Sequence, residues 1–362
     1  MDYYLIGCVL AACVVGLIAV FSATYSMTNG MRLVMIQGAA FLLGCALMVA
    51  ISFFDYELLG DASRYIYIGN VILLVLVLFI GMGRESTGTK GWIDLGIVSV
   101  QPAEIVKIGF ILTFAYHLTR VKEDINYIPT LLLLFLHVGI LVGLILLQPD
   151  AGTAMVFVFI FLSMLFVAKI SYKYVAAFFA VILVGAPTFW YFKDRFLDQY
   201  QIDRLLVFFD PYRDPTGTGY NVIQSEISIG SGQFLGKGYL QGTQNQLEYL
   251  PAKHTDFIFA TIGEEWGFIG AVAVVLLLAA IILRCIYIAQ HTEDLYGKFI
   301  CTGVAAMLAF HTFENIGMCL QLMPVTGIPL PFISYGGSSM VTNLLAIGFV
   351  NCVSVRRRGM SF

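Results

Sequence analysis

Segment 251–260 (PAKHTDFIFA) places a carboxylate, Asp256, where a polar stretch of the chain meets an apolar one. Partial burial raises the pKa of a carboxyl group, and a neighbouring Lys253 or His254 lowers it. A carboxylate balanced in this way can act as a general base that removes a proton from an attacking hydroxyl. The alternative is that Thr255 or Asp256 caps the helix that follows. The local sequence leaves both interpretations open.

A second candidate is the pair Glu104 and Lys107, which stand three residues apart and therefore share one face of a helix. Apolar residues surround the pair, and ionisable groups at membrane depth are costly and by default suggest function. Gln101 and Pro102 place the pair near the outer end of its helix. If they face a pocket, the two side chains would bind a divalent cation or a pyrophosphate. The alternative is a mutual ion pair that locks helix packing.

Two more segments have competing interpretations. Asp150, in a Gln-Pro-Asp sequence between two apolar stretches, either caps a helix at 152–168 or lines an outer cavity. The glycine-rich run 230–238 (GSGQFLGKG) fits a backbone nest for phosphate, with Lys237 as the counter-charge. The run lacks the spacing of a nucleotide P-loop, and tight turns explain its glycines equally well.

The remaining polar groups in apolar surroundings are interpreted mainly as structural. Glu264 and Glu265 begin a helix, where negative charge suits the helix dipole, so we expect them to cap it. Segment 324–339 contains three prolines and three glycines, so it cannot be helical throughout, and at membrane depth it must line a cavity or be buried in protein. A substrate-lining element and a structural re-entrant loop both remain open for it. Three polar residues of one apolar stretch are interpreted as hydrogen-bonded inside the helix bundle: His311, Glu314 and Asn315.

The composition of the 362-residue chain indicates what kind of protein positions these groups. Hydrophobic residues make up 59%, charged residues only 12%, and the mean hydropathy is +0.86. Soluble domains carry about 25% charged residues, so this is an integral membrane protein. The net charge of −3 provides no basic field for nucleic acid. The seven cysteines contain no CxxC pair and lie in apolar stretches, where they serve as small packing residues.

The predicted fold is an all-α polytopic membrane protein, a single integral membrane domain over 1–362. Apolar stretches long enough to cross about 30 Å of hydrocarbon recur along the chain. They predict ten transmembrane helices, at 4–23, 31–53, 65–83, 102–119, 128–147, 152–168, 172–192, 265–289, 298–320 and 339–355. Small residues in several of them, as in 39–44 and 303–309, allow close helix packing.

The charge distribution predicts the orientation of these helices and a functional outer loop. With the N-terminus in the cytoplasm, ten Lys and Arg residues fall on the inner side and three in short outer loops, so both termini are expected inside. Segment 193–262 then forms a large extracytoplasmic loop between helices 7 and 8. It holds 14 of the 43 charged residues, and loops of this length are usually functional or disordered. Its apolar pieces 205–209 and 222–229 favour short helices on the membrane surface.

Four motifs resemble the SEDS family (shape, elongation, division and sporulation) of membrane proteins. The motifs are HTDFIF at 254–259, GEEWGFIG at 263–270, QPDAGT at 148–153 and PVTGIPLPFISYGG at 324–337. The resemblance extends over nearly the whole chain, and long motifs in the same order make coincidence implausible. Segments 210–215 and 242–251 resemble the elongation member of the family more than the division member.

The resemblance implies a peptidoglycan glycosyltransferase that polymerises lipid II at the outer face of the bacterial cytoplasmic membrane. It also implies a class B penicillin-binding protein as the partner that supplies transpeptidation, together with other membrane proteins of the elongation complex. The family's essential loop aspartate matches Asp256, which favours the base over the cap. Its intramembrane Glu/Lys pair matches Glu104 and Lys107, and its QPD aspartate matches Asp150.

The sequence departs from the family at one place. Many members carry arginine directly before the tryptophan of the second outer loop, whereas this chain has Gly91 there and Lys90 one position earlier. Lysine lacks the bidentate fork of arginine, which puts the role of this cation in doubt. Lys90, Lys237 and His254 complete the candidate substrate-binding residues.

The expected reaction is a single inverting displacement. The GlcNAc 4-hydroxyl of the acceptor attacks the anomeric carbon of the donor's MurNAc, Asp256 takes the proton, and undecaprenyl pyrophosphate leaves. Lys107, Lys237 or a divalent cation, magnesium or manganese, is the candidate for neutralising the leaving group, and no organic cofactor is expected. The alternatives are a lipid II flippase, a scaffold that activates its partner, and a division or sporulation paralogue.

Overall fold

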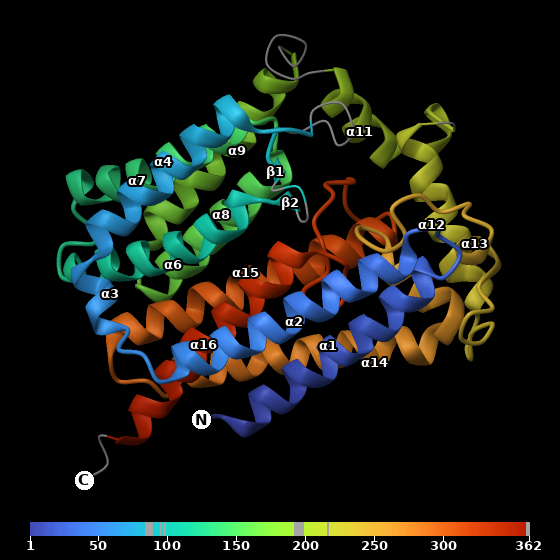
Figure 1. The fold of residues 1–362 in the computed structure, drawn as a ribbon. Helices are drawn as coiled ribbons and strands as arrows, with labels where there is room; N and C mark the ends of the chain where they lie inside the picture. Colours follow the sequence, from blue (N-terminus) through green and yellow to red (C-terminus); the bar gives the residue numbers. More distant parts are fainter. Residues whose placement is uncertain (84–89, 95, 97–98, 192–198, 216, 360–362) are drawn as a thin grey trace.

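The structure is a computed structural model that describes residues 1–83, 90–94, 96, 99–191, 199–215 and 217–359. Figure 1 shows an almost entirely helical chain. Its long helices are α1 (Tyr3–Thr24), α2 (Gly30–Ser52), α4 (Ser63–Ile80), α6 (Pro102–Arg120), α7 (Ile128–Leu146), α8 (Ala151–Val167), α9 (Tyr172–Tyr191), α14 (Ile258–Gln290), α15 (Leu295–Cys319) and α16 (Gly337–Gly359). The shorter elements are α3 (Glu57–Asp61), β1 (Ile93–Asp94), β2 (Ser99–Val100), α11 (Gln199–Phe209), η1 (Pro211–Arg213), α12 (Thr218–Gly232) and α13 (Thr243–Gln246).

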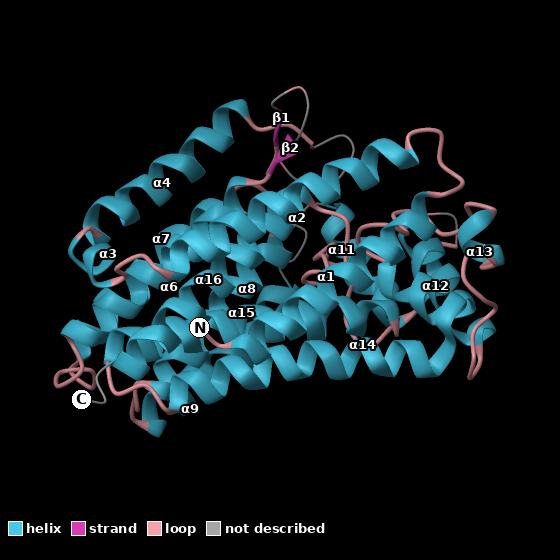
Figure 2. Cartoon of the chain, turned by 60° about the horizontal axis from the view of Figure 1, so that its bottom comes forward, coloured by secondary structure: helices cyan, strands magenta, loops and turns pink. Residues whose placement is uncertain are grey.

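The long helices form two groups that meet along α15. Helices α4, α6, α7, α8 and α9 lie together in one group, and α1, α2, α14 and α16 lie in the other (Figures 1 and 2). Helix α15 contacts α6 and α8 on one side and α14 and α16 on the other. Helices α15 and α16 are mostly buried, whereas α2, α4 and α7 expose leucine, isoleucine and phenylalanine side chains outward. An apolar outer surface of this kind suits hydrocarbon rather than water.

Glycines set the distance between packed helices, as the small residues in the sequence predicted. A Cβ on Gly44 of α2 would lie 2.5 Å from Leu344 Cδ1 of α16. A Cβ on Gly303 of α15 would lie 2.7 Å from Ile111 Cγ2 of α6. Both contacts are shorter than those real Cβ atoms make, so a larger residue at either position would force the neighbouring side chain to shift.

Each of the ten expected spans coincides with a helix among the described residues. Seven of these helices are long and apolar enough to cross a membrane. Helices α8 and α9 contribute shorter apolar stretches, and α6 carries Glu104 and Lys107. The chain is a multi-pass membrane protein, and the count of ten crossings stays a prediction.

Helix α14 begins earlier than expected and contains a kink. The expected span started at 265, whereas helical structure starts at Ile258 and is interrupted at Gly267, with φ 66° and ψ −164°. Glu264 and Glu265 therefore lie in the short helical segment before the kink, and no acidic residue stands in the first turn. The prediction that they cap this helix is wrong, and their actual partners are described below.

Segment 193–262 is largely ordered into short helices. Residues 192–198 and 216 lie outside the described residues, so the start of the expected loop and its charged residues 193–195 and 198 lie there too. The two expected helices are present within α11 and α12, and α12 packs against α14. In Figure 1 these elements and α13 stand at one end of the helix bundle, away from the C-terminus.

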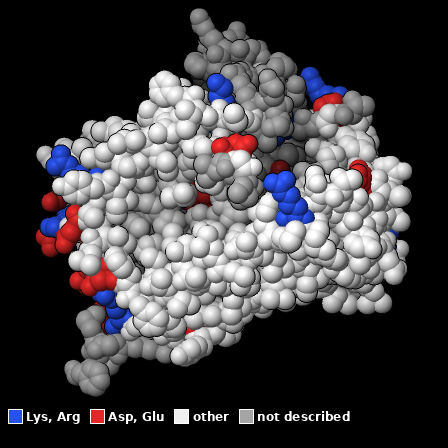
Figure 3. Space-filling model, in the orientation of Figure 1, with Lys and Arg blue, Asp and Glu red and all other residues white. Residues whose placement is uncertain are grey.

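Charged side chains are segregated along the bundle. In Figure 3 most of the visible surface is uncharged, and Lys, Arg, Asp and Glu side chains gather at the left end and around a hollow near the top. The ion pair Arg356–Asp55 joins the C-terminal part of α16 to the loop after α2, and Asp2, the N-cap of α1, binds Arg284 of α14 across 2.7 Å. The opposite end of the helices holds the segment around Asp256.

Candidate active site

A cavity of about 420 Å³ lies at the end of the bundle near α11 and brings four of the sequence candidates together. Its wall includes Asp256, the Glu104–Lys107 pair and Asp150. These residues come from the segment before α14, from α6 and from the start of α8, so only the tertiary fold makes them neighbours. The rest of the wall is formed by Trp92, Gln101, Thr153, Val156, Arg204, Asn221, Ala252, Thr255, His311, Thr326, Gly327, Ile328, Pro329, Tyr335, Gly336, Ser338 and Ser339.

Hydrogen bonds to backbone carbonyl groups hold the segment around Asp256 in place, and the residue lines the cavity. Asn315 Nδ2 of α15 donates to the Asp256 carbonyl across 2.8 Å and to the carbonyl of Ile328 at the same distance. Ser334 Oγ donates to the carbonyl of Thr255 across 2.7 Å. The residue at the N-cap of α14 is Phe257, and no side chain caps this helix. The cap alternative for Asp256 and Thr255 is therefore wrong.

Burial raises the pKa of the Asp256 carboxyl to about 6. The guanidinium of Arg204 and a hydrogen bond from Thr255 act in the opposite direction and limit the rise. A carboxyl group with a pKa near 6 is mostly ionised at neutral pH and is more basic than an ordinary aspartate. Both properties are those of a general base.

The irregular segment 324–336 forms one wall of the cavity and supports Asp256. Its Thr326, Gly327, Ile328 and Pro329 line the cavity, so the cavity-lining interpretation of this segment is confirmed. Gly327 adopts φ +76°, and a Cβ there would lie 3.3 Å from Asp256 Oδ2. Glycine thus provides both the backbone conformation and the room for the carboxylate.

We expect Gly327→Ala to slow the reaction several-fold and to lower stability by about 1–2 kcal/mol, because the left-handed conformation is unfavourable for alanine and its methyl group crowds Asp256. Turnover and thermal unfolding of the purified protein measure the two effects. The control is Gly143→Ala in α7, where a Cβ would meet no atom within 4 Å. Wild-type turnover of Gly327→Ala would contradict this role of the glycine.

The Glu104–Lys107 pair is both an ion pair and part of the cavity wall. Lys107 Nζ lies 2.7 Å from Glu104 Oε1 and 2.9 Å from His311 Nε2 of α15. Glu104 and Lys107 are 4% and 1% exposed, so the pair is almost fully desolvated. An ammonium donates its hydrogens, so His311 accepts through a deprotonated Nε2. The two interpretations left open by the sequence therefore coexist.

Asp150 likewise combines the two roles considered for it. Its Oδ1 accepts the backbone N–H of Thr153 across 2.9 Å, which makes it the N-cap of α8. Its Oδ2 accepts from the Thr153 hydroxyl at 2.8 Å and from Gln101 Nε2 at 3.2 Å. The same carboxylate lines the cavity, so a helix cap fixes its position there.

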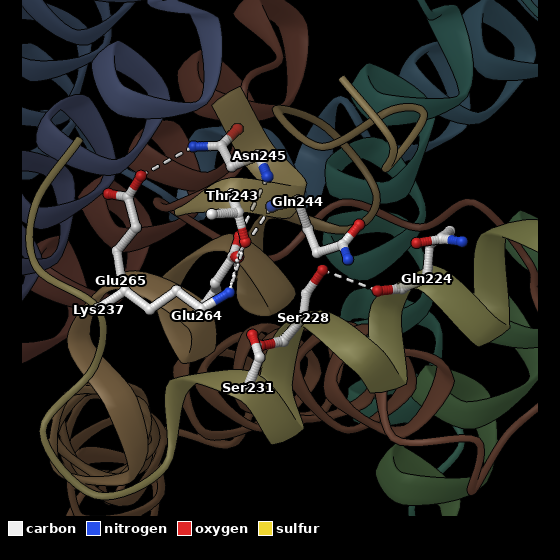
Figure 4. A network of polar contacts seen from close by, with 9 residues as sticks. All are labelled: Gln224, Ser228, Ser231, Lys237, Thr243, Gln244, Asn245, Glu264 and Glu265. Carbon is white, nitrogen blue, oxygen red and sulfur yellow. Dashed lines mark hydrogen bonds and ion pairs between the residues drawn. The ribbon is translucent and has the colours of Figure 1, made fainter. Parts of the chain in front are cut away.

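Three of the expected substrate-binding residues do not line the cavity. Lys90 lies next to the wall, its N–H bonded to the Gln148 carbonyl, while Trp92 two residues on forms part of the wall. His254 packs its ring 5.5 Å from that of Tyr335, behind the wall. Lys237 binds Glu264 Oε1 across 2.7 Å in a separate network (Figure 4).

The phosphate nest expected around 230–238 is absent for a definite reason. The N–H groups of Lys237 and Gly238 donate to the carbonyls of Glu264 and Glu265, each across 3.0 Å. A Cβ on Gly236 would lie 2.1 Å from the Glu265 carbonyl oxygen. These glycines permit close packing against α14 instead of binding an anion, so the phosphate-nest prediction is wrong.

One charged residue of the cavity, Arg204, was not identified from the sequence. Arg204 of α11 faces the cavity and influences the carboxyls of both Asp256 and Asp150 electrostatically. The apolar run after it in 205–209 indicated an amphipathic helix, but nothing local indicated where its arginine points. The bundle contacts expected for His311, Glu314 and Asn315 are present. His311 also lines the cavity, which the sequence did not indicate.

The described residues include no group of three or more His, Cys, Asp or Glu side chains that could hold a metal ion. Magnesium sites at phosphates often use one or two carboxylates, with the remaining ligands from substrate and water. Asp150 is a carboxylate of the cavity that fits such a shared site. Within the described parts of the chain, the protein does not supply a complete cage.

Comparison with known proteins gives consistent matches over the whole chain. A family model for cell cycle proteins, named for FtsW, RodA and SpoVE, matches residues 3–359. The peptidoglycan glycosyltransferase MrdB of Escherichia coli K12 is 37% identical, covering 88% of this chain and 85% of MrdB. The peptidoglycan glycosyltransferase RodA of Treponema pallidum is 31% identical and covers 98% of both. The probable peptidoglycan glycosyltransferase FtsW of Geobacter metallireducens is 33% identical, covering 95% of this chain and 92% of that protein.

Solved structures share the fold. A chain from a study of structural coordination of polymerization and crosslinking by a peptidoglycan synthase complex matches with a TM-score of 0.83 and 31% identity, over 98% of both chains. The crystal structure of the rod shape-determining protein RodA of Thermus thermophilus matches with a TM-score of 0.72 and 28% identity, over 98% of this chain and 97% of that one.

Proposed function

We propose that this chain, which belongs to the FtsW, RodA and SpoVE family of cell cycle proteins and is a peptidoglycan glycosyltransferase, polymerises lipid II. The proposed product is β-1,4 glycan, made during cell elongation. Segments 210–215 and 242–251, which resemble the elongation member of the family more than the division member, support elongation over division. The observation that carries the proposal is Asp256, a half-buried carboxylate that lines a cavity together with Arg204 and Lys107 and whose pKa is raised by burial.

The cavity contains both kinds of group that an inverting glycosyl transfer needs. The 4-hydroxyl oxygen of the acceptor GlcNAc attacks the anomeric carbon of the donor MurNAc, and Asp256 accepts the hydroxyl proton. The bond from that carbon to the pyrophosphate oxygen breaks, and its electron pair leaves with undecaprenyl pyrophosphate. Because one displacement inverts the α-linked donor to a β-linked product, a single base suffices.

Arg204 replaces Lys237 as the cation proposed for the leaving group. Guanidinium binds phosphate oxygens through two parallel hydrogen bonds, and Arg204 lines the cavity whereas Lys237 is paired with Glu264 elsewhere. Lys107 adds a second positive charge to the same cavity. A magnesium or manganese ion held by Asp150 and the pyrophosphate would supply further charge neutralisation.

We expect Arg204→Gln to lower turnover about 10- to 100-fold, because a hydrogen bond to a charged group contributes about 1.5–3 kcal/mol. The Michaelis constant for lipid II should change less, since the charge on the leaving oxygen develops in the transition state. Steady-state kinetics of the variant separate the two parameters. Arg204→Lys keeps the charge but loses the bidentate geometry, so its turnover should lie between that of the wild type and that of Arg204→Gln. Equal turnover of all three proteins would remove Arg204 from the mechanism.

The cavity is proposed to face the outer side of the bacterial cytoplasmic membrane. The ion pairs of Arg284 and Arg356 lie at the opposite end of the bundle, and basic residues mark the cytoplasmic side. Both termini are then cytoplasmic. Cysteine labelling with a membrane-impermeant reagent tests this, after the seven native cysteines are replaced: a cysteine at Glu226 should react in intact cells, and one at Glu123 only after lysis.

The proposed partner is a class B penicillin-binding protein that crosslinks the strands. The fold match to a chain from a peptidoglycan synthase complex, which coordinates polymerization and crosslinking, supports such a partnership. Other membrane proteins of the elongation complex are proposed as further partners.

The decisive experiment follows labelled lipid II with the purified protein, alone and with its penicillin-binding protein. Glycan strands that lysozyme digests are the expected product. A second assay follows lipid II across vesicle membranes containing the same protein. Transport without polymer would replace the proposal by a flippase, and polymer made only by the partner would replace it by a scaffold.

A further inference from the structure

Four buried or half-buried charges surround Asn245 in α13, outside the cavity, and Figure 4 shows three of them: Lys237, Glu264 and Glu265. We name them the α13 cluster: Lys237, Lys253, Glu264 and Glu265. Lys253, Glu264 and Glu265 are 1%, 0% and 2% exposed. A buried charge is tolerated only when it is paired and hydrogen-bonded, and two cations with two carboxylates make this cluster neutral.

The two carboxylates fix Asn245 from both sides. Glu264 accepts the backbone N–H groups of Gln244 and Asn245 across 2.9 and 3.1 Å and also binds Lys237. Glu265 accepts from Asn245 Nδ2 across 2.9 Å and from Ser22 Oγ of α1 across 2.6 Å. Adjacent residues at the kink of α14 therefore hold the first turn of α13 and attach it to α1.

Lys253 connects this fixed point to the segment that carries Asp256. Its Nζ donates to the backbone carbonyl of Asn245 and, across 2.9 Å, to Ser26 Oγ after α1. Lys253 stands three positions before Asp256, and hydrogen bonds close the turn between them. The N–H groups of Thr255 and Phe257 both donate to the Ala252 carbonyl, across 3.1 and 3.2 Å.

We propose that Lys253 is a positioning residue for the glycosyl transfer, which ties the Asp256 turn to α13 and α1 and so holds the carboxylate at its place in the cavity. The proposal rests on the proposed function of Asp256 as the base. Segment 324–336 supports the turn from one side, through Ser334 and Tyr335, whose N–H donates to the His254 carbonyl across 2.8 Å. Lys253 supplies the attachment on the other side. A displacement of about 1 Å in a reacting group can cost 100-fold in rate.

The test compares Lys253→Met with Lys237→Met. Both substitutions remove one cation from the α13 cluster, but only Lys253 touches the Asp256 turn. We expect Lys253→Met to lower turnover by about 10- to 100-fold, with little change in the Michaelis constant, because positioning acts on the reacting atoms. Lys237→Met takes the cation from buried Glu264 and should lower stability, but the folded protein should retain turnover within about threefold of the wild type. Lys253→Arg, which keeps a charged donor, should restore most of the activity.

A second readout does not require catalysis. Hydrogen exchange of the Thr255 and Phe257 amides should accelerate at least tenfold in Lys253→Met and remain near wild type in Lys237→Met. Ser26→Ala, which removes only one of the two contacts, provides a milder variant if Lys253→Met does not fold.

The proposal is supported if Lys253→Met, but not Lys237→Met, shows slow turnover together with faster exchange of the Thr255 and Phe257 amides. It is overturned if Lys253→Met keeps wild-type turnover, or if both lysine variants lose turnover and protection equally, which would indicate a role only in stability. If even the wild type makes no polymer, the proposed function fails, and amide exchange alone still decides whether Lys253 holds the turn.

Discussion

Asp256→Asn is expected to lower lipid II polymerisation by about 10²- to 10⁴-fold, the usual contribution of a general base. Asparagine has nearly the same shape but cannot accept the hydroxyl proton. Glycan synthesis by the purified protein with its penicillin-binding protein measures the loss. Glu226→Gln, which neutralises an exposed carboxylate of α12, is the matched control and should retain full activity. Equal polymer from Asp256→Asn and wild type would exclude Asp256 as the base.

The wild-type rate should also depend on pH in a defined direction. Burial raises the pKa of Asp256 to about 6, so the base is protonated and inactive below that value. Turnover is therefore expected to rise tenfold per pH unit below about 6 and to level off above it. A raised carboxyl pKa also means that ionised Asp256 destabilises the folded protein above pH 6. Asp256→Asn should consequently be at least as stable as wild type at neutral pH, so lost activity cannot be attributed to misfolding.

Lys107→Met is expected to destabilise the folded protein more than Asp256→Asn or Glu226→Gln does. It leaves the carboxylate of Glu104, which is 4% exposed, without its cation. Removing one partner of a buried ion pair costs about 3–5 kcal/mol, so the unfolding temperature of the purified protein should fall and polymerisation should be lost.

The double variant Glu104→Gln/Lys107→Met separates packing from function. It leaves no unpaired buried charge at either position, so most of the lost stability should return. Activity should not return, because the cavity still lacks the ammonium group. If the double variant regained both stability and activity, the pair would serve helix packing alone.

Local patterns along the chain were sufficient for the helices and for the main chemical candidates. Composition required a membrane protein, and apolar stretches located the helices because a helix in hydrocarbon satisfies its own backbone. Segment 254–259 identified Asp256, and the three-residue spacing of Glu104 and Lys107 placed them on one helical face. These features depend on a few neighbouring residues, which the sequence displays directly.

Long-range contacts decided the rest. The sequence suggested Lys237 as a phosphate ligand and Glu264 and Glu265 as helix caps. In the structure Lys237 pairs with Glu264, and both glutamates accept hydrogen bonds from α13. Conversely, Arg204 lines the cavity, and His311 is hydrogen-bonded to Lys107, which is 204 positions away in the sequence. Residue spacing and composition alone indicate which helices form and which groups can do chemistry. Which charges are neutralised by a buried partner and which line the cavity depends instead on how helices that are distant in the chain pack together.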